Sequence, residues 1–591
     1  MRRAAGDIAA VAAFCLAGFY LTSGLLPDPG GLHVTGNRQD SVQLQWLLQH
    51  ATRLFTHGES PLFTTLVNAP FGVNLMANPS ILAFALPLAP VTLAFGPGVS
   101  AMLLMTFTPA ATAAAWYHVL SRHVVRARGA AFVGALFAGF APAMVSHDTG
   151  HPNIVAQFLL PYLLLAVLRL RQPGQAVLIG VELAGLVIVQ IFINEEMLFL
   201  TAVTILLFLL AVLAQRPRAI LPHLRAGLLA AGVTTVVAGA ILAYPLWYQF
   251  FGPMAYRGLP TFVLDYGTDL ASFPAFSWES LAGPSSGPMT SANLTEQNAY
   301  YGWPLLVMLA VIVVWLRRDL VVRAITVTAL VLSVLSLGRT VTVNGDSTGV
   351  WAPWAQVSHL PLFDSVVPTR LSLFVTPLIA ILLALGVDRA ATALGRADGS
   401  ALGRADGSAH GLERIGAATL VVLVLAALAP ITPTPIEVSA NAPTPRFFTS
   451  GAWRQTIPDG GCVLPVFLNW DANVDVMQWQ LATGLRFVTP GGYYLAPGPT
   501  GSDRRANFGP VYRPTLDRLL QVDQSGQPVA VGDTVAIGQA REDLRTWRVD
   551  ALVLPDGHPS AEALRISVDR LVGPGRHVED VWVWDVRQMR A

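Results

Sequence analysis

The first three quarters of this chain are mostly apolar, with acidic and basic residues between the apolar stretches. Two of these charged residues are of types that could remove a proton or bind an anion. Asp40 closes the polar run Asn37-Arg38-Gln39-Asp40, shortly after the first apolar stretch. A carboxylate acts as a general base when it lies within hydrogen-bond reach of the proton that it removes. Arg370 begins a later apolar stretch, and the planar guanidinium of Arg binds phosphate oxygens in pairs. Asp40 and Arg370, with Arg38 and Arg257 as alternatives to Arg370, are therefore candidate functional residues.

A second group of polar residues could hold a hydroxyl-rich ligand. Its members are Asn74, Asp148, His151, Asn153, Glu195, Glu196 and Glu296. A carboxylate in the middle of a bilayer costs about 2.5–3.5 kcal/mol, so acids near apolar stretches are candidates for function. Alternatives stay open. Glu195 and Glu196 could simply end two helices. His147, Asp148 and His151 have the spacing of a metal site, and Asp148 or Asn153 could equally cap a helix.

The composition is that of an integral membrane protein. Of 591 residues, 53% are hydrophobic and 12% charged, and the mean hydropathy is +0.53. The formal net charge of +1 gives no attraction to nucleic acid. Cys15 lies in an apolar stretch and Cys462 in the distal soluble segment. The two cysteines therefore do not suggest a disulfide framework or a metal site.

Eleven apolar runs come close to the length of about 20 residues that a membrane-spanning helix needs. They are 7–27, 98–121, 129–146, 153–170, 174–193, 197–214, 226–247, 303–316, 320–338, 370–388 and 415–432. Arginines gather in alternate turns, which the positive-inside rule assigns to the cytoplasm. The N-terminus is therefore predicted to be cytoplasmic, and residues 433–591 extracytoplasmic.

Residues 80–97 are apolar and nearly long enough to cross a membrane. Counting them as a crossing would reverse the side of every later turn. We therefore predict an interfacial or re-entrant helix inside the first outer loop, residues 28–97, with a twelfth span as the alternative. This loop completes a predicted transmembrane domain over residues 1–432.

The composition changes after residue 433. Short strand-like runs at 462–466, 551–555 and 581–584 alternate with helical patterns at 515–522 and 561–571. This alternation predicts a small α/β domain over residues 433–591. A tandem eight-residue repeat over 394–409 precedes it, and its small residues indicate a flexible linker.

Several short stretches resemble a known family. They are Arg38-Gln39-Asp40, residues 68–75, Gly150-His151-Pro152-Asn153, Asn194-Glu195-Glu196, Glu296 with Tyr301-Gly302, and Val367-Pro368-Thr369-Arg370. Together with an early acidic residue in a long outer loop, they resemble the GT-C glycosyltransferases, which are polytopic enzymes that use polyprenyl-phosphate sugars. More narrowly, the chain resembles bacterial multipass proteins related to those that glycosylate teichoic acids.

The resemblance implies inverting transfer of a sugar from a polyprenyl-phosphate donor to a glycan or lipid acceptor of the cell envelope. Asp40 would be the base, an arginine would neutralise the departing phosphate, and the polar group named above would grip sugar hydroxyls. The protein would lie in the bacterial plasma membrane among its lipids. Gln39 stands where the family often has a second acid, so the sequence leaves open whether a divalent cation takes part.

Two other functions fit the sequence less closely. A lipid-linked sugar flippase would also have acids at the rim of a helical bundle, but here the acids gather on the predicted outer side and no inverted repeat is visible. A non-catalytic assembly protein of the cell envelope could use the α/β domain for docking.

Overall fold

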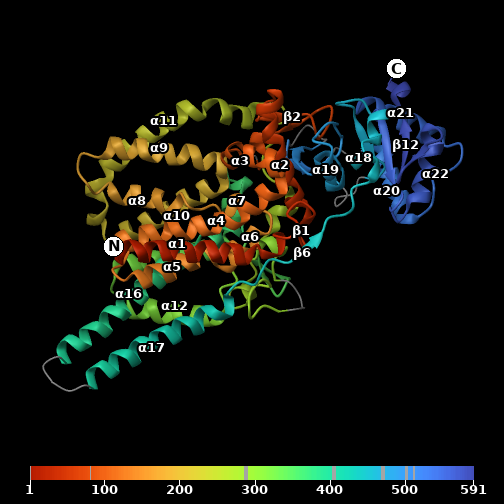
Figure 1. Cartoon of the computed structure of the whole chain (residues 1–591). Coiled ribbons are helices and arrows are strands. Elements are labelled where there is room, and N and C mark those ends of the chain that lie inside the picture. Colours follow the sequence, from red (N-terminus) through yellow and green to blue (C-terminus); the bar gives the residue numbers. More distant parts are fainter. Residues whose placement is uncertain are drawn as a thin grey trace.

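A computed structural model describes residues 2–79, 81–284, 290–401, 408–467, 473–498, 504–509 and 513–590. Most helices run side by side in one bundle (Figure 1). They are α1 (Arg2–Leu21), α4 (Pro97–Val119), α5 (Arg128–Phe140), α6 (Pro142–Asp148), α7 (Pro152–Val155), α8 (Leu160–Arg169), α9 (Ala176–Ile193), α10 (Glu195–Gln215), α11 (Leu224–Phe251), α12 (Trp303–Trp315), α13 (Leu320–Leu335), α15 (Arg370–Leu373), α16 (Val375–Ala401) and α17 (Ser408–Leu428). Every predicted span coincides with one of these helices or with two consecutive ones, so the polytopic bundle is confirmed.

The helices differ in length. Within the described residues, eight stretches are long and apolar enough to cross a membrane: 4–21, 97–124, 128–148, 152–169, 176–193, 195–215, 217–251 and 370–394. The helices α12 and α13 and the stretch 416–431 are apolar but shorter. In α11, Leu228, Val236 and Ile241 are all more than half exposed, as expected of side chains that face lipid. The predicted linker 394–409 is largely helical, because α16 and α17 extend into it, and its residues 402–407 lie outside the described part.

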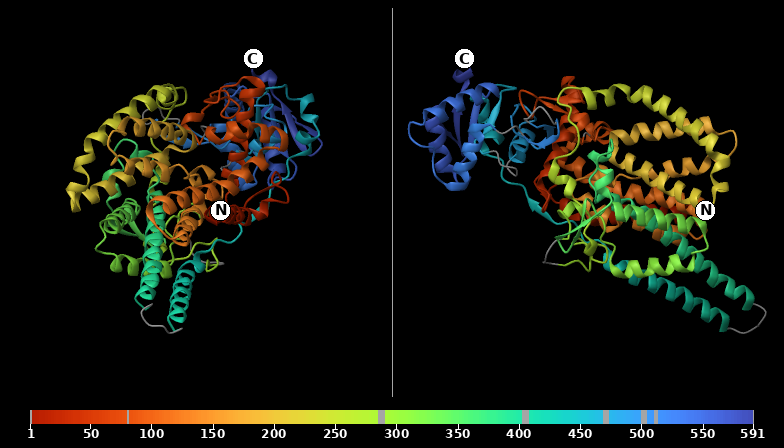
Figure 2. Two further views of the ribbon diagram at one scale, coloured as in Figure 1. Left: turned by 60° about the vertical axis from the view of Figure 1, so that its left-hand side comes forward. Right: turned by 180° about the vertical axis from the view of Figure 1, so that it is seen from behind.

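The two ends of the bundle carry different groups. At the end that holds the N-terminus, Asp7 pairs with Arg122 at 2.9 Å and with Arg128 at 3.4 Å. The C-terminal domain lies beyond the opposite end (Figures 1 and 2). This arrangement agrees with the arginine pattern of the sequence, and the side of the membrane that each end faces stays a prediction.

The first outer loop is more ordered than its polar sequence suggests. It contains β1 (Leu32–Val34), α2 (Arg38–His57), the β2–β3 hairpin (Phe63–Thr64 and Val73–Asn74) and α3 (Leu82–Phe95). Asp40 lies in the first turn of α2, where a negative charge is stabilised by the helix dipole. The 14 residues of α3 rise only about 21 Å, less than the ~30 Å of bilayer hydrocarbon. This length suits the predicted interfacial helix.

The chain after residue 433 forms the predicted α/β unit. Its sheet has the order β11-β12-β10-β7, built from Arg576–Val578, Val581–Asp585, Ala551–Pro555 and Val463–Pro465. Only β7 and β10 are parallel. The helices are α18 (Arg446–Thr449), α19 (Asn473–Ala482), α20 (Pro514–Ser525), α21 (Thr534–Thr546) and α22 (Ala561–Val572). The boundary at residue 433 stays a prediction.

This unit is joined to the first outer loop at several places. The strand β6 (Val438–Ala440) pairs with β1, so that Leu32 lies opposite Ala440. The Trp46 indole donates to Gln480 of α19 at 2.9 Å. A second hairpin, β8 (Leu495–Pro497) and β9 (Ala506–Phe508), is held by Asn78, whose side chain bonds both the N–H and the C=O of Leu495. Residues far apart in the sequence therefore surround the start of α2.

Candidate active site

Asp40 and His151 form a close pair at the end of the bundle nearest the C-terminal domain. The Nε2 atom of His151 lies 3.2 Å from Oδ2 of Asp40. Their side chains are 19% and 15% exposed, so both are sheltered but reachable. The sequence had named both residues separately, as a base and as a substrate ligand, and the structure brings them together.

Two further side chains hold the Asp40 carboxylate. Asn37 and Tyr493 both hydrogen-bond to it, and the Asn37 amide also donates to the carbonyl of Thr149 at 3.1 Å. Burial by itself raises the pKa of Asp40, but the electrostatic effect of His151 and these hydrogen bonds outweigh burial, so the pKa lies below its usual value. Burial and the charge of Asp40 raise the pKa of the Tyr493 phenol, which therefore stays a donor. Asp40 is ionised, as a general base must be.

This environment predicts a specific pH dependence. Because the pKa of Asp40 is lowered, the ionised base persists to low pH and is lost only as pH falls through that lowered pKa. His151→Gln removes the electrostatic effect of the imidazole on Asp40, so we expect the acid limb of kcat/KM to move to higher pH. The check is a pH–rate profile beside His57→Gln, an exposed histidine of α2. An acid limb that His151→Gln leaves in place would contradict the pairing.

Gly150 permits the close approach of the loop that carries His151. A Cβ atom at this position would lie 2.5 Å from Nδ2 of Asn37 and 2.9 Å from Cβ of Asp40. Gly150→Ala must therefore push the loop away from α2. A displacement of about 1 Å in an active site can cost roughly 100-fold in rate, and we expect a loss of that order. Transfer rates measured beside Gly185→Ala, whose new methyl group meets open space, would show whether the loss is specific to this contact.

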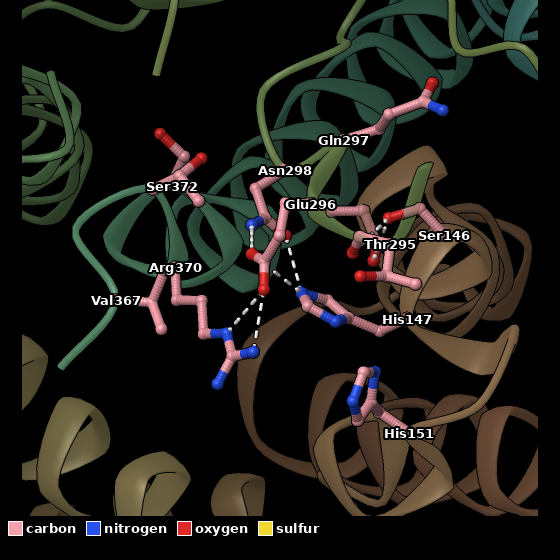
Figure 3. A network of polar contacts seen from close by, with 12 residues as sticks. Ser146, His147, His151, Thr295, Glu296, Gln297, Asn298, Val367, Arg370 and Ser372 are labelled. Carbon is pink, nitrogen blue, oxygen red and sulfur yellow. Dashed lines mark hydrogen bonds and ion pairs between the residues drawn. The ribbon is translucent and has the colours of Figure 1, made fainter. Parts of the chain in front are cut away.

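A second polar group surrounds Arg370, close to the first. The guanidinium contacts Glu296 through Nε at 3.0 Å and through Nη2 at 2.7 Å, and Glu196 through Nη1 at 2.5 Å. Figure 3 shows Arg370 and His147 reaching Glu296 from opposite sides, with His151 beside His147. The His147 Nε2 atom is 2.8 Å from Oδ1 of Asn298, and the two histidine rings are 6.0 Å apart, edge to face. His151 thus lies between the two groups.

The contacts of Arg370 leave it poorly suited to bind phosphate. Two carboxylates face one guanidinium, which leaves one negative charge in excess. Burial raises the pKa of Glu296, but the charge of Arg370 outweighs burial and holds the pKa below its usual value, so Glu296 is ionised. A further anion at Arg370 would be repelled.

The two alternative arginines differ from each other. Arg38 contacts Asp475 and, at 2.5 Å, the amide oxygen of Gln478. The side chain of Arg257 is exposed, and within the described part of the chain no carboxylate pairs with it. Its backbone N–H donates to the carbonyl of Arg504 at 2.8 Å, which places a second arginine beside it. Arg257 is therefore the better candidate for an anion site.

The loop 146–153 holds the other predicted ligands in unequal settings. Asp148 is fully buried, and neither of its carboxylate oxygens has a partner among the described residues. Asn153 is 7% exposed in α7, and neither it nor Asp148 caps a helix. Among the residues that the structure describes, no three His, Cys, Asp or Glu side chains are arranged to hold a metal ion.

Asn74 and Glu195 both contact the end of α11, through Tyr248 and Gln249 respectively. The amide oxygen of Asn74 caps the short helix η2 (Leu75–Ala77), and its nitrogen donates to the carbonyl of Tyr248 at 2.9 Å. These contacts give Asn74 a structural role. Glu195 accepts a hydrogen bond of 2.7 Å from Gln249 and is half-buried, so it keeps capacity to bind a hydroxyl.

Sequence reasoning missed Asn37, Asn298 and Tyr493. The first two stand close to named acids in the chain, in Asn37-Arg38-Gln39-Asp40 and Glu296-Gln297-Asn298, and that proximity was the available signal. Tyr493 comes from the C-terminal part, 453 positions after Asp40, and nothing local marks it.

With this geometry in place, comparison with other proteins identifies the family. A family model matches residues 31–365, and its description is "Domain of unknown function (DUF6311)". The chain belongs to this family. The matched part of this DUF6311 protein includes Asp40, His151, Glu196 and Glu296, whereas Arg370 and Tyr493 lie beyond it. No curated protein matches the chain.

Solved structures show which fold the DUF6311 chain has. The arabinofuranosyltransferase AftD from mycobacteria matches 99% of this chain with a TM-score of 0.55 at 13% identity. The chain spans 40% of the length of AftD. The oligosaccharyltransferase of Archaeoglobus fulgidus (TM-score 0.49, 13% identity, 95% of this chain and 71% of that one) and ArnT from Cupriavidus metallidurans bound to undecaprenyl phosphate (0.44, 10%, 98% and 97%) are also similar. The likeness to AftD shows that the DUF6311 protein has the fold of that membrane glycosyltransferase, and the predicted resemblance to GT-C glycosyltransferases is confirmed.

Proposed function

We propose that this protein is a membrane glycosyltransferase that moves a sugar from a polyprenyl-phosphate donor to an acceptor of the cell envelope. The observation that carries the proposal is the ionised Asp40, held 3.2 Å from His151 at one end of a GT-C bundle. The likeness to AftD supports the fold, and the site supports the chemistry. We place this end and the C-terminal domain outside the plasma membrane of a bacterium.

Asp40 is the general base of the proposed reaction. It takes the proton of an acceptor hydroxyl while the oxygen bonds to the anomeric carbon of the donor sugar. The bond from that carbon to the lipid phosphate breaks at the same time, and the phosphate leaves with the bonding electrons. Displacement from the face opposite the phosphate inverts the anomeric centre. His151 and Tyr493 orient the carboxylate for this step.

Arg257 is the cation that we assign to the departing phosphate. Its guanidinium is exposed, whereas those of Arg370 and Arg38 are held by carboxylates. Glu195 with Gln249 is the group that we assign to sugar hydroxyls, because a carboxylate accepts hydrogen bonds from them. The polyprenyl tail would lie against the apolar helices.

Arg257→Gln is expected to raise KM for the donor about 10- to 100-fold, since a hydrogen bond to a charged group contributes about 1.5–3 kcal/mol. Steady-state rates at varied donor concentration measure this effect. Arg541→Gln, at an exposed site on α21, is the matched control. An unchanged donor KM in Arg257→Gln would remove this residue from the phosphate site.

Reconstitution tests the proposed function itself. The full chain in proteoliposomes is supplied with a panel of radiolabelled polyprenyl-phosphate sugars and with envelope glycans and lipids as acceptors. Labelled product is the expected result. Movement of labelled lipid across the bilayer without sugar transfer would show that the protein is a flippase and would contradict the proposed enzyme. Neither transfer nor movement would favour a non-catalytic assembly protein.

A further inference from the structure

Four aromatic side chains form a continuous cluster beside Asp40. Tyr493, which hydrogen-bonds Asp40, stacks on Phe508 with ring centroids 5.4 Å apart and planes at 19°. Phe508 lies 6.1 Å from Phe262, and Phe262 lies 6.0 Å from Tyr266. We call Phe262, Tyr266, Tyr493 and Phe508 the aromatic cluster. It joins the loop after α11 to the hairpin of the C-terminal part, two segments distant in the sequence.

The cluster reaches both polar groups of the site. Its Tyr493 end touches Asp40. At its other end, burial raises the pKa of the Tyr266 phenol, and the nearby charge of Glu296 raises it further. The Tyr266 backbone also accepts a hydrogen bond of 3.0 Å from Thr369, next to Arg370. A molecule lying on these rings would therefore have the base at one edge and the Arg370 group at another.

The cluster differs from an ordinary hydrophobic core in its exposure. Phe262 is 47% exposed as a residue, and the other three residues are half-buried. Burial of a phenyl ring is favourable, so a large exposed ring in a cluster that reaches Asp40 through Phe508 and Tyr493 is better explained by a ligand than by folding. Among the residues described, no protein group hydrogen-bonds the Tyr266 hydroxyl, which leaves a polar group at the edge of the rings.

A sugar ring has the surface that this arrangement matches. One face of such a ring presents C–H groups, which pack on an aromatic plane through dispersion and loss of hydrated apolar surface. Its edge presents hydroxyls that need hydrogen-bonding partners. An apolar floor with a few polar groups at its margin is the usual build of a site for a small polar ligand.

We propose that the aromatic cluster binds the acceptor and that the acceptor is a carbohydrate, with one sugar ring on Phe262 and Tyr266 and its reacting hydroxyl toward Asp40. This inference rests on the proposed glycosyl transfer and narrows its acceptor from a glycan or a lipid to a glycan. The cluster is assigned to the acceptor because its Tyr493 end contacts Asp40, the group that takes the proton of the acceptor hydroxyl. The lipid-linked donor, by contrast, must enter from the helices.

Direct binding without any donor tests this assignment. The full chain in lipid nanodiscs is titrated with arabinan, galactan, mannan and glucan tetrasaccharides, and binding is followed by saturation-transfer NMR. We expect at least one tetrasaccharide to bind. Phe262→Ala should weaken that binding about tenfold or more, as the loss of a central aromatic contact usually does. Phe262→Trp should retain it, and Tyr266→Phe should weaken it several-fold by loss of one hydrogen bond.

The matched control is Phe55→Ala, because Phe55 is 63% exposed on α2 but lies outside the cluster, and it should bind as the wild type does. Absence of binding by the wild type to all four tetrasaccharides would overturn the proposal. So would equal affinity of Phe262→Ala and wild type, or an equal loss in Phe55→Ala. Binding without sugar transfer would support the carbohydrate site and count against the proposed enzyme, so the two failures are distinguishable.

Discussion

Asp40→Asn is expected to lower kcat for sugar transfer by about 100- to 10,000-fold, which is the usual contribution of a positioned general base. The amide has the shape of the carboxylate but cannot accept the proton of the acceptor hydroxyl. His151 and Tyr493 can still contact it, so the site should keep its form. Single-turnover transfer in proteoliposomes, at saturating donor, measures the effect on the chemical step.

The control for Asp40→Asn is the same substitution at Asp459, whose side chain is 71% exposed in the C-terminal domain. It should transfer sugar at the wild-type rate. Thermal unfolding of both variants checks that they are folded. Wild-type activity in Asp40→Asn would show that another group removes the proton, and Glu195 and Glu196 would be the next residues to replace.

Arg370→Gln is expected to lower the free energy of unfolding by about 3–5 kcal/mol, because removing one partner of a buried ion pair leaves its charge uncompensated. Glu196 and Glu296, which are 16% and 3% exposed, would then both lose their cation. Denaturant unfolding of the purified protein in detergent measures this change. We expect this loss of stability in Arg370→Gln, whereas the KM for the donor should stay close to the wild-type value.

A second variant separates this structural role from phosphate binding. Adding Glu296→Gln to Arg370→Gln removes one of the two uncompensated charges, so part of the lost stability should return. Arg541→Gln on α21 serves as the exposed control and should unfold as the wild type does. If Arg370→Gln had the stability of the wild type but a raised KM for the donor, Arg370 would be assigned to phosphate binding.

These two variants distinguish neighbouring groups with different tasks. Asp40 is exposed enough to meet a substrate and is held by neutral donors and one histidine. Arg370 joins three elements, because Glu196 lies in the first turn of α10, Glu296 ends the short helix η8 (Leu294–Glu296) and Arg370 begins α15. The first arrangement suits chemistry, and the second fixes the bundle end that supports it.

The sequence alone determined the elements of this protein. Apolar runs of membrane-spanning length predicted the helices, because a bilayer demands continuous internal hydrogen bonding. Alternating strand and helix patterns predicted the C-terminal α/β unit, whose β7, β10 and β12 lie where the runs at 462–466, 551–555 and 581–584 stand. Local composition is sufficient for such predictions, since they depend on near neighbours in the chain.

Only the tertiary structure decided how the polar residues are used. The sequence offered Asp40, His151, Arg370 and Arg257 as separate candidates. Folding paired Asp40 with His151 and brought the Tyr493 hydroxyl to the Asp40 carboxylate. It also placed two carboxylates around Arg370 and left Arg257 exposed. Ion pairing and burial depend on which distant segments converge, and charges act over a few ångströms of space whatever their separation in sequence. No spacing along the chain encodes that convergence.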